Sequence, residues 1–251
     1  MSARKGASTK VLTSLVQSNN DLTRDVQNCI VSIDIGIINL GYCIFSWDKD
    51  VDPNTLEIDD MDLTFDVFSI KSTGAALKRK MKFNNVVHER CATLQHFFNI
   101  IGGKFNIVKV IIERQVPTNT KAMELMYAIT SIALTYTPDV VIFDPKCKFT
   151  RIGLPYVTKN KHHKKQSIVM AGRLLKRWFG DDYESAFNKH PKKDDIADAL
   201  NQCLNHICDK RFIKTGLGVY GMVVQGLSSE IKIENSNDDS EDEEMNEEDD
   251  N

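Results

Sequence analysis

The chain has 251 residues, of which 41% are hydrophobic and 27% charged, as in an ordinary globular protein with a sizeable core. No apolar stretch approaches the roughly 18 residues that a membrane-spanning helix needs, and six cysteines without a C-x-x-C pair indicate thiols in a reducing intracellular compartment. The formal net charge of −3 hides a division, because residues 238–251 hold ten acids and no base, whereas the rest of the chain holds 32 basic against 25 acidic residues.

The first third of the chain reads as an extension followed by a strand meander. Residues 1–27 lack sustained periodicity and are predicted to be a flexible N-terminal extension; a mitochondrial presequence is the alternative, because the first 20 residues hold no acid. A buried strand is expected from residue 29, turning at Gly36 and resuming to residue 47. Residues 47–61 hold five aspartates and are predicted to be a loop. Residues 63–70 alternate apolar and polar side chains, which predicts a third strand.

Helices and strands alternate in the remainder. Helices are predicted over residues 83–101, 119–136, 165–179 and 193–207, and strands over 105–113 and 140–143, the last a short apolar run of the buried, parallel kind. A meander followed by this alternation predicts an α/β fold with a mixed sheet covered by helices. We assign residues 28–226 to this domain and residues 227–251 to a disordered acidic tail.

Two carboxylates end predicted strands. Asp34 precedes the turn at Gly36, and Glu113 ends a strand in which five of the six preceding residues are apolar. A carboxylate beside a buried strand is costly to desolvate unless something pairs with it. Each acid also has a plainer interpretation, a turn residue for Asp34 and an ion pair with Arg114 for Glu113.

The helix predicted over residues 193–207 carries the remaining acids. Its apolar residues form one continuous stripe, and Asp195 and Asp198, three residues apart, flank that stripe on one face. Packing the stripe on the sheet would bring both acids to the ends of the two strands. The plainer interpretation is that Asp194 and its neighbours cap the helix and favour its dipole. A cluster of carboxylates predicts a site for hard divalent cations such as Mg²⁺.

A basic stretch precedes this helix. From Pro145 to Gly180 the chain holds ten lysines and arginines and no acid. A basic face of this size favours a polyanionic partner, and a solvated lysine face is the alternative. The predicted phosphate contacts are Lys159, Lys161, Lys164 and Lys165.

The order strand Asp, strand Glu, helix Asp-x-x-Asp resembles that of RNase H-like nucleases. The motifs Ile112-Glu113-Arg114-Gln115 and Asp195-x-x-Asp198-Ala199 are similar to those of the RuvC-type Holliday junction resolvases of poxviruses, other large DNA viruses and fungal mitochondria. The resemblance covers about residues 29–207 and implies an RNase H-like mixed five-stranded sheet flanked by helices. Bacterial RuvC places an aromatic wedge three residues after its second acid, where this chain has Val116.

The resemblance also implies a function. It implies a structure-selective endonuclease that resolves four-way DNA junctions by paired nicks, as a homodimer, in DNA recombination or replication. Asp34 would bridge two Mg²⁺ ions, for which Mn²⁺ can substitute, while Glu113 serves one ion and Asp195 and Asp198 the other. A register shift of one residue would exchange Asp195 for Asp194.

Alternatives remain open at this point. Another RNase H-like nuclease, a ribonuclease or transposase-like enzyme, would use the same acids, and a non-catalytic junction-binding module would share the fold. The helix over residues 119–136 is the candidate dimer interface, with about half of its apolar residues expected in the core. A viral replication site in the host cytoplasm is the expected location, with the mitochondrion as the alternative.

Overall fold

The computed structural model of the chain describes residues 26–52, 56, 60–70, 83–147 and 160–209, and the side chains of residues 83–88, 160–162 and 207–209 are not among those described. The described strands are β1 (Gln27–Ile35), β2 (Asn39–Trp47), β3 (Asp62–Ser69), β4 (Phe105–Glu113) and β5 (Val140–Phe143). The described helices are α2 (Phe83–Gly102), α3 (Thr120–Ala133), α5 (Asn160–Phe179), α6 (Asp181–Lys189) and α7 (Lys193–Asp209). The predicted acidic tail and nearly all of the predicted N-terminal extension lie outside the described residues.

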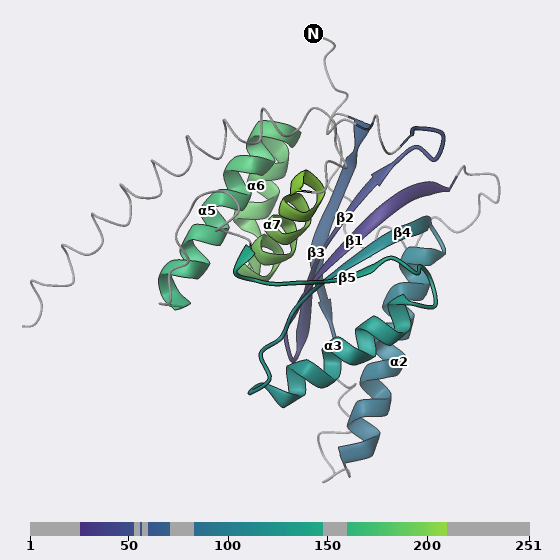
Figure 1. Cartoon of the computed structure of the whole chain (residues 1–251). Helices are drawn as coiled ribbons and strands as arrows, with labels where there is room; N and C mark the ends of the chain where they lie inside the picture. Colours follow the sequence, from purple (N-terminus) through teal and green to yellow (C-terminus); the bar gives the residue numbers. More distant parts are fainter. Residues whose placement is uncertain (1–25, 53–55, 57–59, 71–82, 148–159, 210–251) are drawn as a thin grey trace, which may run out of the picture.

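The described strands form one mixed sheet in the order β3-β2-β1-β4-β5 (Figure 1). The first three strands are an antiparallel meander, and β4 and β5 run parallel to β1. The predicted five-stranded mixed sheet is therefore confirmed. With neighbours on both sides, β1 is the central strand, which explains why Ile30, Val31 and Ile33 are fully buried.

The turn between β1 and β2 depends on Gly36. A Cβ atom at this position would lie 2.3 Å from the backbone oxygen of Asn39, so a side chain would obstruct the return of the chain. The tight turn places β2 beside β1 with Asp34 opposite Gly41.

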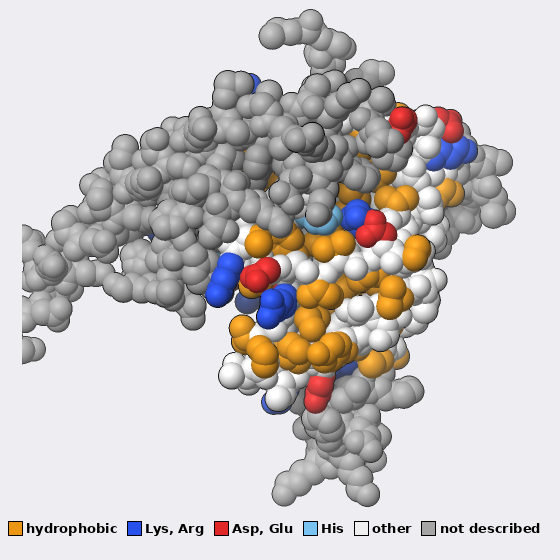
Figure 2. Space-filling model, viewed as in Figure 1, with side chains coloured by type: hydrophobic (Ala, Val, Ile, Leu, Met, Phe, Trp, Pro, Cys, Tyr) orange, Lys and Arg blue, Asp and Glu red, His pale blue; other side chains and the backbone are white. Residues whose placement is uncertain are grey.

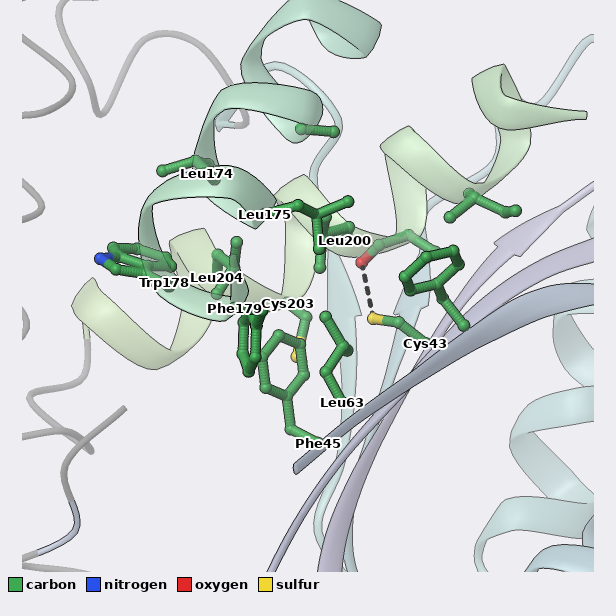
Figure 3. Close-up of a cluster of buried hydrophobic side chains, with 14 of the residues drawn as sticks. Cys43, Phe45, Leu63, Leu174, Leu175, Trp178, Phe179, Leu200, Cys203 and Leu204 are labelled. Atoms are coloured by element: carbon green, nitrogen blue, oxygen red, sulfur yellow. Dashed lines mark hydrogen bonds between the residues drawn. The ribbon is translucent and has the colours of Figure 1, made fainter. Parts of the chain in front are cut away.

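Helices cover both faces of the sheet (Figure 1), so two cores form. On one face, alternate residues of the strands pack on α2 and α3, as in the edge-to-face contact of Tyr42 with Phe97 at 5.2 Å. On the other face, residues such as Cys43 and Phe45 pack on α5, α6 and α7 (Figure 3). The Cys43 thiol also donates to the backbone oxygen of Ala199 in α7, at 3.5 Å. The acidic residues of interest lie on this second face.

Three details differ from the predictions. The predicted parallel strand at residues 140–143 is confirmed as β5, but its predicted burial was wrong, because among the described strands β5 pairs with β4 alone and forms a sheet edge where Ile142 is 40% exposed. Helix α5 begins at residue 160, five residues earlier than predicted. Helix α6 was missed, because a nine-residue helix with two buried anchors, Tyr183 and Phe187, gives little periodic signal. No helix of the described part of the chain is long and apolar enough to cross a membrane.

Candidate active site

Asp34 is the last residue but one of β1, and Glu113 is the last residue of the neighbouring parallel strand β4. The parallel register pairs Ile33 with Ile112, and the next residues along the two strands are Asp34 and Glu113. Side chains alternate along a strand, so Asp34 shares a face with Ser32, whose hydroxyl donates to the Ala199 oxygen of α7 at 2.8 Å. Glu113 likewise shares a face with Ile111, which belongs to the core beneath α7. Both half-buried carboxylates therefore lie at one sheet end, on the face covered by α7.

The first turn of α7 lies directly on β2. A Cβ atom built on Gly41 would be 2.3 Å from the backbone oxygen of Asp195 and 2.9 Å from its Cβ, so only a glycine leaves room for the helix. Gly41 is also the residue opposite Asp34. The close approach at Gly41 thus brings Asp195 to the sheet end that carries Asp34.

Asp198 lies one turn further along α7 and is held by α5. The buried hydroxyl of Ser167 donates to the Asp198 carboxylate at 2.7 Å. The side-chain amide of Asn201 donates in turn to the Ser167 hydroxyl, at 2.9 Å. Ser167 and Asn201 were not predicted from the sequence, because neither belongs to a motif and each acquires its role only when α5 packs on α7.

Lys164 connects the basic helix α5 to the acids. Its ammonium group lies 2.8 Å from the Asp194 carboxylate, while its side chain remains 59% exposed. The hydrogen bond with Asp194 raises the pKa of Lys164, assisted by the charges of the other α7 acids and opposed by partial burial. Burial alone would raise the pKa of Asp194, but the hydrogen bond and charge of Lys164 lower it overall. Asp194 therefore faces Lys164, whereas Asp195 faces the sheet.

Asp195 has the electrostatics of a crowded carboxylate. Its pKa is raised, chiefly by burial and then by the negative charges of Asp194 and Asp198, against the opposing charges of Lys192 and Lys164. A divalent cation would offset both effects, and an all-oxygen donor set suits a hard cation. No three His, Cys, Asp or Glu side chains within the described ranges already lie close enough together to hold a metal ion. The four predicted ligand acids suit a divalent metal ion by their chemistry and by their placement at one end of the sheet. To bind the ion, their side chains must move closer together.

The surroundings of Glu113 disfavour the plainer interpretation of this residue. Arg114 pairs with Asp144 at 3.5 Å and is largely exposed. The side-chain amide of Gln115 lies 3.4 Å from the Glu113 carboxylate. In the Glu-Arg-Gln motif, the arginine therefore pairs with Asp144, the residue that follows β5, and the glutamine contacts the Glu113 carboxylate.

The predicted phosphate contacts are only partly described. Lys164 and Lys165 are exposed near the start of α5, beside the acids of α7. Lys159 and the side chain of Lys161 lie outside the described residues. Val116, at the position of the bacterial wedge, is an exposed apolar residue.

Solved structures resemble this fold. The fowlpox virus resolvase, solved in complex with substrate Holliday junction DNA, is 23% identical, with 71% of this chain and 96% of that chain covered and a TM-score of 0.45. Thermus thermophilus RuvC is 16% identical, with 71% and 92% covered and a TM-score of 0.45. The yeast mitochondrial Holliday junction resolvase Ydc2 is 16% identical, with 88% and 90% covered and a TM-score of 0.50, which shows a shared fold.

The sequence of the chain matches one protein family. No curated protein matches the sequence significantly. The family described as Poxvirus A22 protein matches residues 28–210. This range includes every described helix and every described strand, apart from the first residue of β1. The chain belongs to the Poxvirus A22 protein family.

Proposed function

We propose that this protein is a structure-selective endonuclease that resolves four-way DNA junctions by paired nicks, in the recombination or replication of DNA. The observation that carries the proposal is the gathering of acids from β1, β4 and α7 at one sheet end, next to the basic helix α5. The fold shared with the yeast mitochondrial resolvase and the two resolvase-like motifs support it. A module that only binds DNA gains nothing from clustered negative charge beside a phosphate.

We assign Asp34, Glu113, Asp195 and Asp198 as the metal ligands and Mg²⁺ as the cofactor, with two ions and with Mn²⁺ as a substitute. Bound metal supplies an activated water and charge stabilisation at the leaving oxygen of the scissile phosphate. The hydrogen bond from Ser167 to the Asp198 carboxylate and the pairing of Lys164 with Asp194 support the choice of Asp198 as a ligand and of Asp194 as the additional acid.

Branched DNA is the proposed substrate, held by backbone contacts. Lys164 and Lys165 are exposed on α5, and Lys159 and Lys161 precede them in the chain. Contacts of lysine with phosphate supply affinity without sequence information, which suits an enzyme that recognises DNA by its branched shape.

We further propose a homodimer, because a junction presents two equivalent strands for paired cleavage. Helix α3 buries Met126 and Ile129 in the core, as expected for about half of the apolar residues of this segment, but Tyr127 of α3 and its C-cap residue Leu134 are 60% and 54% exposed. Figure 2 shows hydrophobic side chains gathered on this face of the molecule, over α3. These exposed side chains are the proposed contact between subunits.

The location proposed for this activity is a viral replication site, with the mitochondrion as the alternative. The family supports the first and the fold likeness to the yeast mitochondrial resolvase leaves the second open.

A cleavage assay on matched substrates tests the proposal. A synthetic four-way junction, a linear duplex and an RNA–DNA hybrid are incubated with the full chain in Mg²⁺ or in EDTA. We expect symmetrical nicks in the junction alone, and only with Mg²⁺. Asp34→Asn should abolish cleavage while junction binding persists or tightens, because a charge that repels phosphate is removed. Asp62→Asn, at the exposed start of β3, is the matched control and should cleave normally.

Each other outcome has a defined meaning. Preferred cleavage of the hybrid would indicate another RNase H-like nuclease. Tight junction binding with no cleavage in Mg²⁺ or Mn²⁺ would indicate a binding module. Cleavage by Asp34→Asn at the wild-type rate would remove Asp34 from the catalytic residues.

A further inference from the structure

Gln202 is a fully buried amide on the face of α7 that packs on the sheet. Its side-chain nitrogen, Nε2, donates to the Ser32 hydroxyl at 2.9 Å and to the backbone oxygen of Ile33 at 3.1 Å. The same nitrogen lies 3.3 Å from the backbone oxygen of Ile111. One side chain of α7 thus contacts both β1 and β4.

The positions of these acceptors relate Gln202 to the acids. Ile33 immediately precedes Asp34, and Ile111 stands two residues before Glu113. Gln202 itself lies one turn beyond Asp198 on the same helix. A single buried amide therefore joins the three elements that carry all four of the proposed metal ligands.

The hydrogen bonds of the Gln202 amide leave its other polar atom unsatisfied. Among the described residues, the side-chain oxygen of Gln202 has no hydrogen-bond partner, although it is buried. Buried polar atoms without partners are rare in native proteins because their desolvation is not compensated. Methionine has a similar shape and would avoid that cost, but it would leave the Ser32 hydroxyl and the Ile33 oxygen without this donor. The glutamine therefore makes hydrogen bonds to the strands and leaves one buried oxygen unpartnered within the described part of the chain.

We propose that Gln202 is a positioning residue, whose amide fixes the register of α7 against the ends of β1 and β4. The acids of the sheet and the acids of α7 come from separate elements, so their spacing depends on this register. Small displacements matter, because reacting groups must be held to within a fraction of an ångström. This inference rests on the proposed function for its catalytic consequence, but not for its consequence for metal binding.

Gln202→Met in the full chain tests the inference with three measurements. Thermal unfolding in EDTA should show lowered stability, because the hydrogen bonds donated to Ser32 and Ile33 are lost together with the unpartnered oxygen, and it sets a temperature at which both proteins are folded for the other two measurements. Calorimetric titration with Mn²⁺ in the absence of DNA should show metal affinity lowered about 10–100-fold, the usual effect of losing a residue that orients ligands. Junction cleavage should slow by a similar factor, with junction affinity unchanged within about twofold and partial recovery at high Mg²⁺ concentration.

The matched control is Gln166→Met. Gln166 is a buried glutamine of α5 whose side-chain oxygen likewise has no partner in the described part of the chain, and none of the hydrogen bonds between described residues joins its side chain to β1 or β4. Its variant should keep wild-type metal affinity and cleavage. Equal Mn²⁺ affinity in Gln202→Met and the wild type would overturn the positioning role.

A second variant covers the case in which Gln202→Met fails to fold. Ser32→Ala removes one acceptor of the amide and should lower Mn²⁺ affinity in the same direction by a smaller factor; an unchanged affinity would equally overturn the role. If the wild type binds Mn²⁺ but cuts no junction, the proposed function fails, while the metal titrations still decide the role of Gln202.

Discussion

Replacing Gly41 with alanine tests the contact that brings α7 to the sheet. The added Cβ atom would lie 2.3 Å from the backbone oxygen of Asp195, 2.5 Å from its backbone carbon and 2.9 Å from its Cβ. These are atoms of the backbone and its first side-chain carbon, so no flexible side chain can move aside. The strand and the helix must separate instead.

The size of the separation sets the expected effects. Ordinary contacts of a Cβ atom begin at 3.4 Å, so the first turn of α7 must shift by about 1 Å. Overpacking of this kind costs roughly 1–3 kcal/mol of folding free energy. A shift of about 1 Å at a reacting centre costs on the order of 100-fold in rate. We therefore expect Gly41→Ala to lose modest stability and most of its activity.

Gly172→Ala is the matched control. Gly172 lies inside α5, and the atom nearest to its would-be Cβ is 3.8 Å away, an ordinary contact. Alanine in a helix interior is favoured over glycine by roughly 0.5–1 kcal/mol. This variant should unfold at a slightly higher temperature and cleave junctions at the wild-type rate.

The assay combines thermal unfolding with single-turnover junction cleavage, under conditions where each variant is fully folded. Gly41→Ala with an unchanged unfolding temperature and cleavage rate would refute the close packing of α7 on β2. Lower stability with an unchanged cleavage rate would retain the packing but separate it from the positioning of Asp195.

Two further substitutions examine the acids of α7. Ser167→Ala removes the hydroxyl that donates to Asp198, so half-maximal cleavage should require about 10–100-fold more metal while junction binding stays constant; superimposable metal titrations would leave Ser167 with a structural role only. Asp195→Asn removes a carboxylate whose pKa in the folded protein is raised by burial and by the charges of Asp194 and Asp198. Because the folded protein holds this proton more tightly than the unfolded chain, the stability of the wild type falls as the pH rises from the unfolded-state pKa through the folded-state pKa. The metal-free variant should therefore be more stable than the wild type near pH 7 and lose that advantage at acidic pH; denaturant unfolding across this range in EDTA measures it, and a variant less stable near neutrality would contradict the electrostatic account.

The arrangement of the acids was largely predictable from the sequence. Apolar runs located β1 and β4, and the carboxylate that ends each run was evident from the order of residues. The apolar stripe of α7 indicated the face that packs on the sheet, because helical periodicity is determined by geometry alone. The choice of Asp195 over Asp194 agrees with the observed contact of Asp195 with Gly41, although their assignment as ligands stays a prediction.

The contacts that support the acids were not predictable. Gln202, Asn201 and Ser167 are polar residues of helices, and such residues usually face solvent. Their burial arises because α7 is covered by the sheet on one side and by α5 on another, which depends on packing between segments far apart in the sequence. The partner of Lys164 was missed for the same reason, because an acid-free stretch of chain receives its acid from α7.

Helix α5 relates the two halves of the proposed site. Its exposed lysines are the proposed contacts to DNA phosphates, and two residues three positions apart, Lys164 and Ser167, contact acids of α7. A phosphate that draws Lys164 away from Asp194 would leave the α7 acids with less compensating charge, which favours the binding of a divalent cation at the same place. DNA binding and metal binding are then expected to reinforce one another. The phosphate removes the positive charge of Lys164 from the acids, and the metal ion replaces that charge. The acids of α7 repel a phosphate unless a metal ion lies between them, so DNA and metal are expected to bind together. This suits the proposed enzyme, which would cut only when DNA is bound.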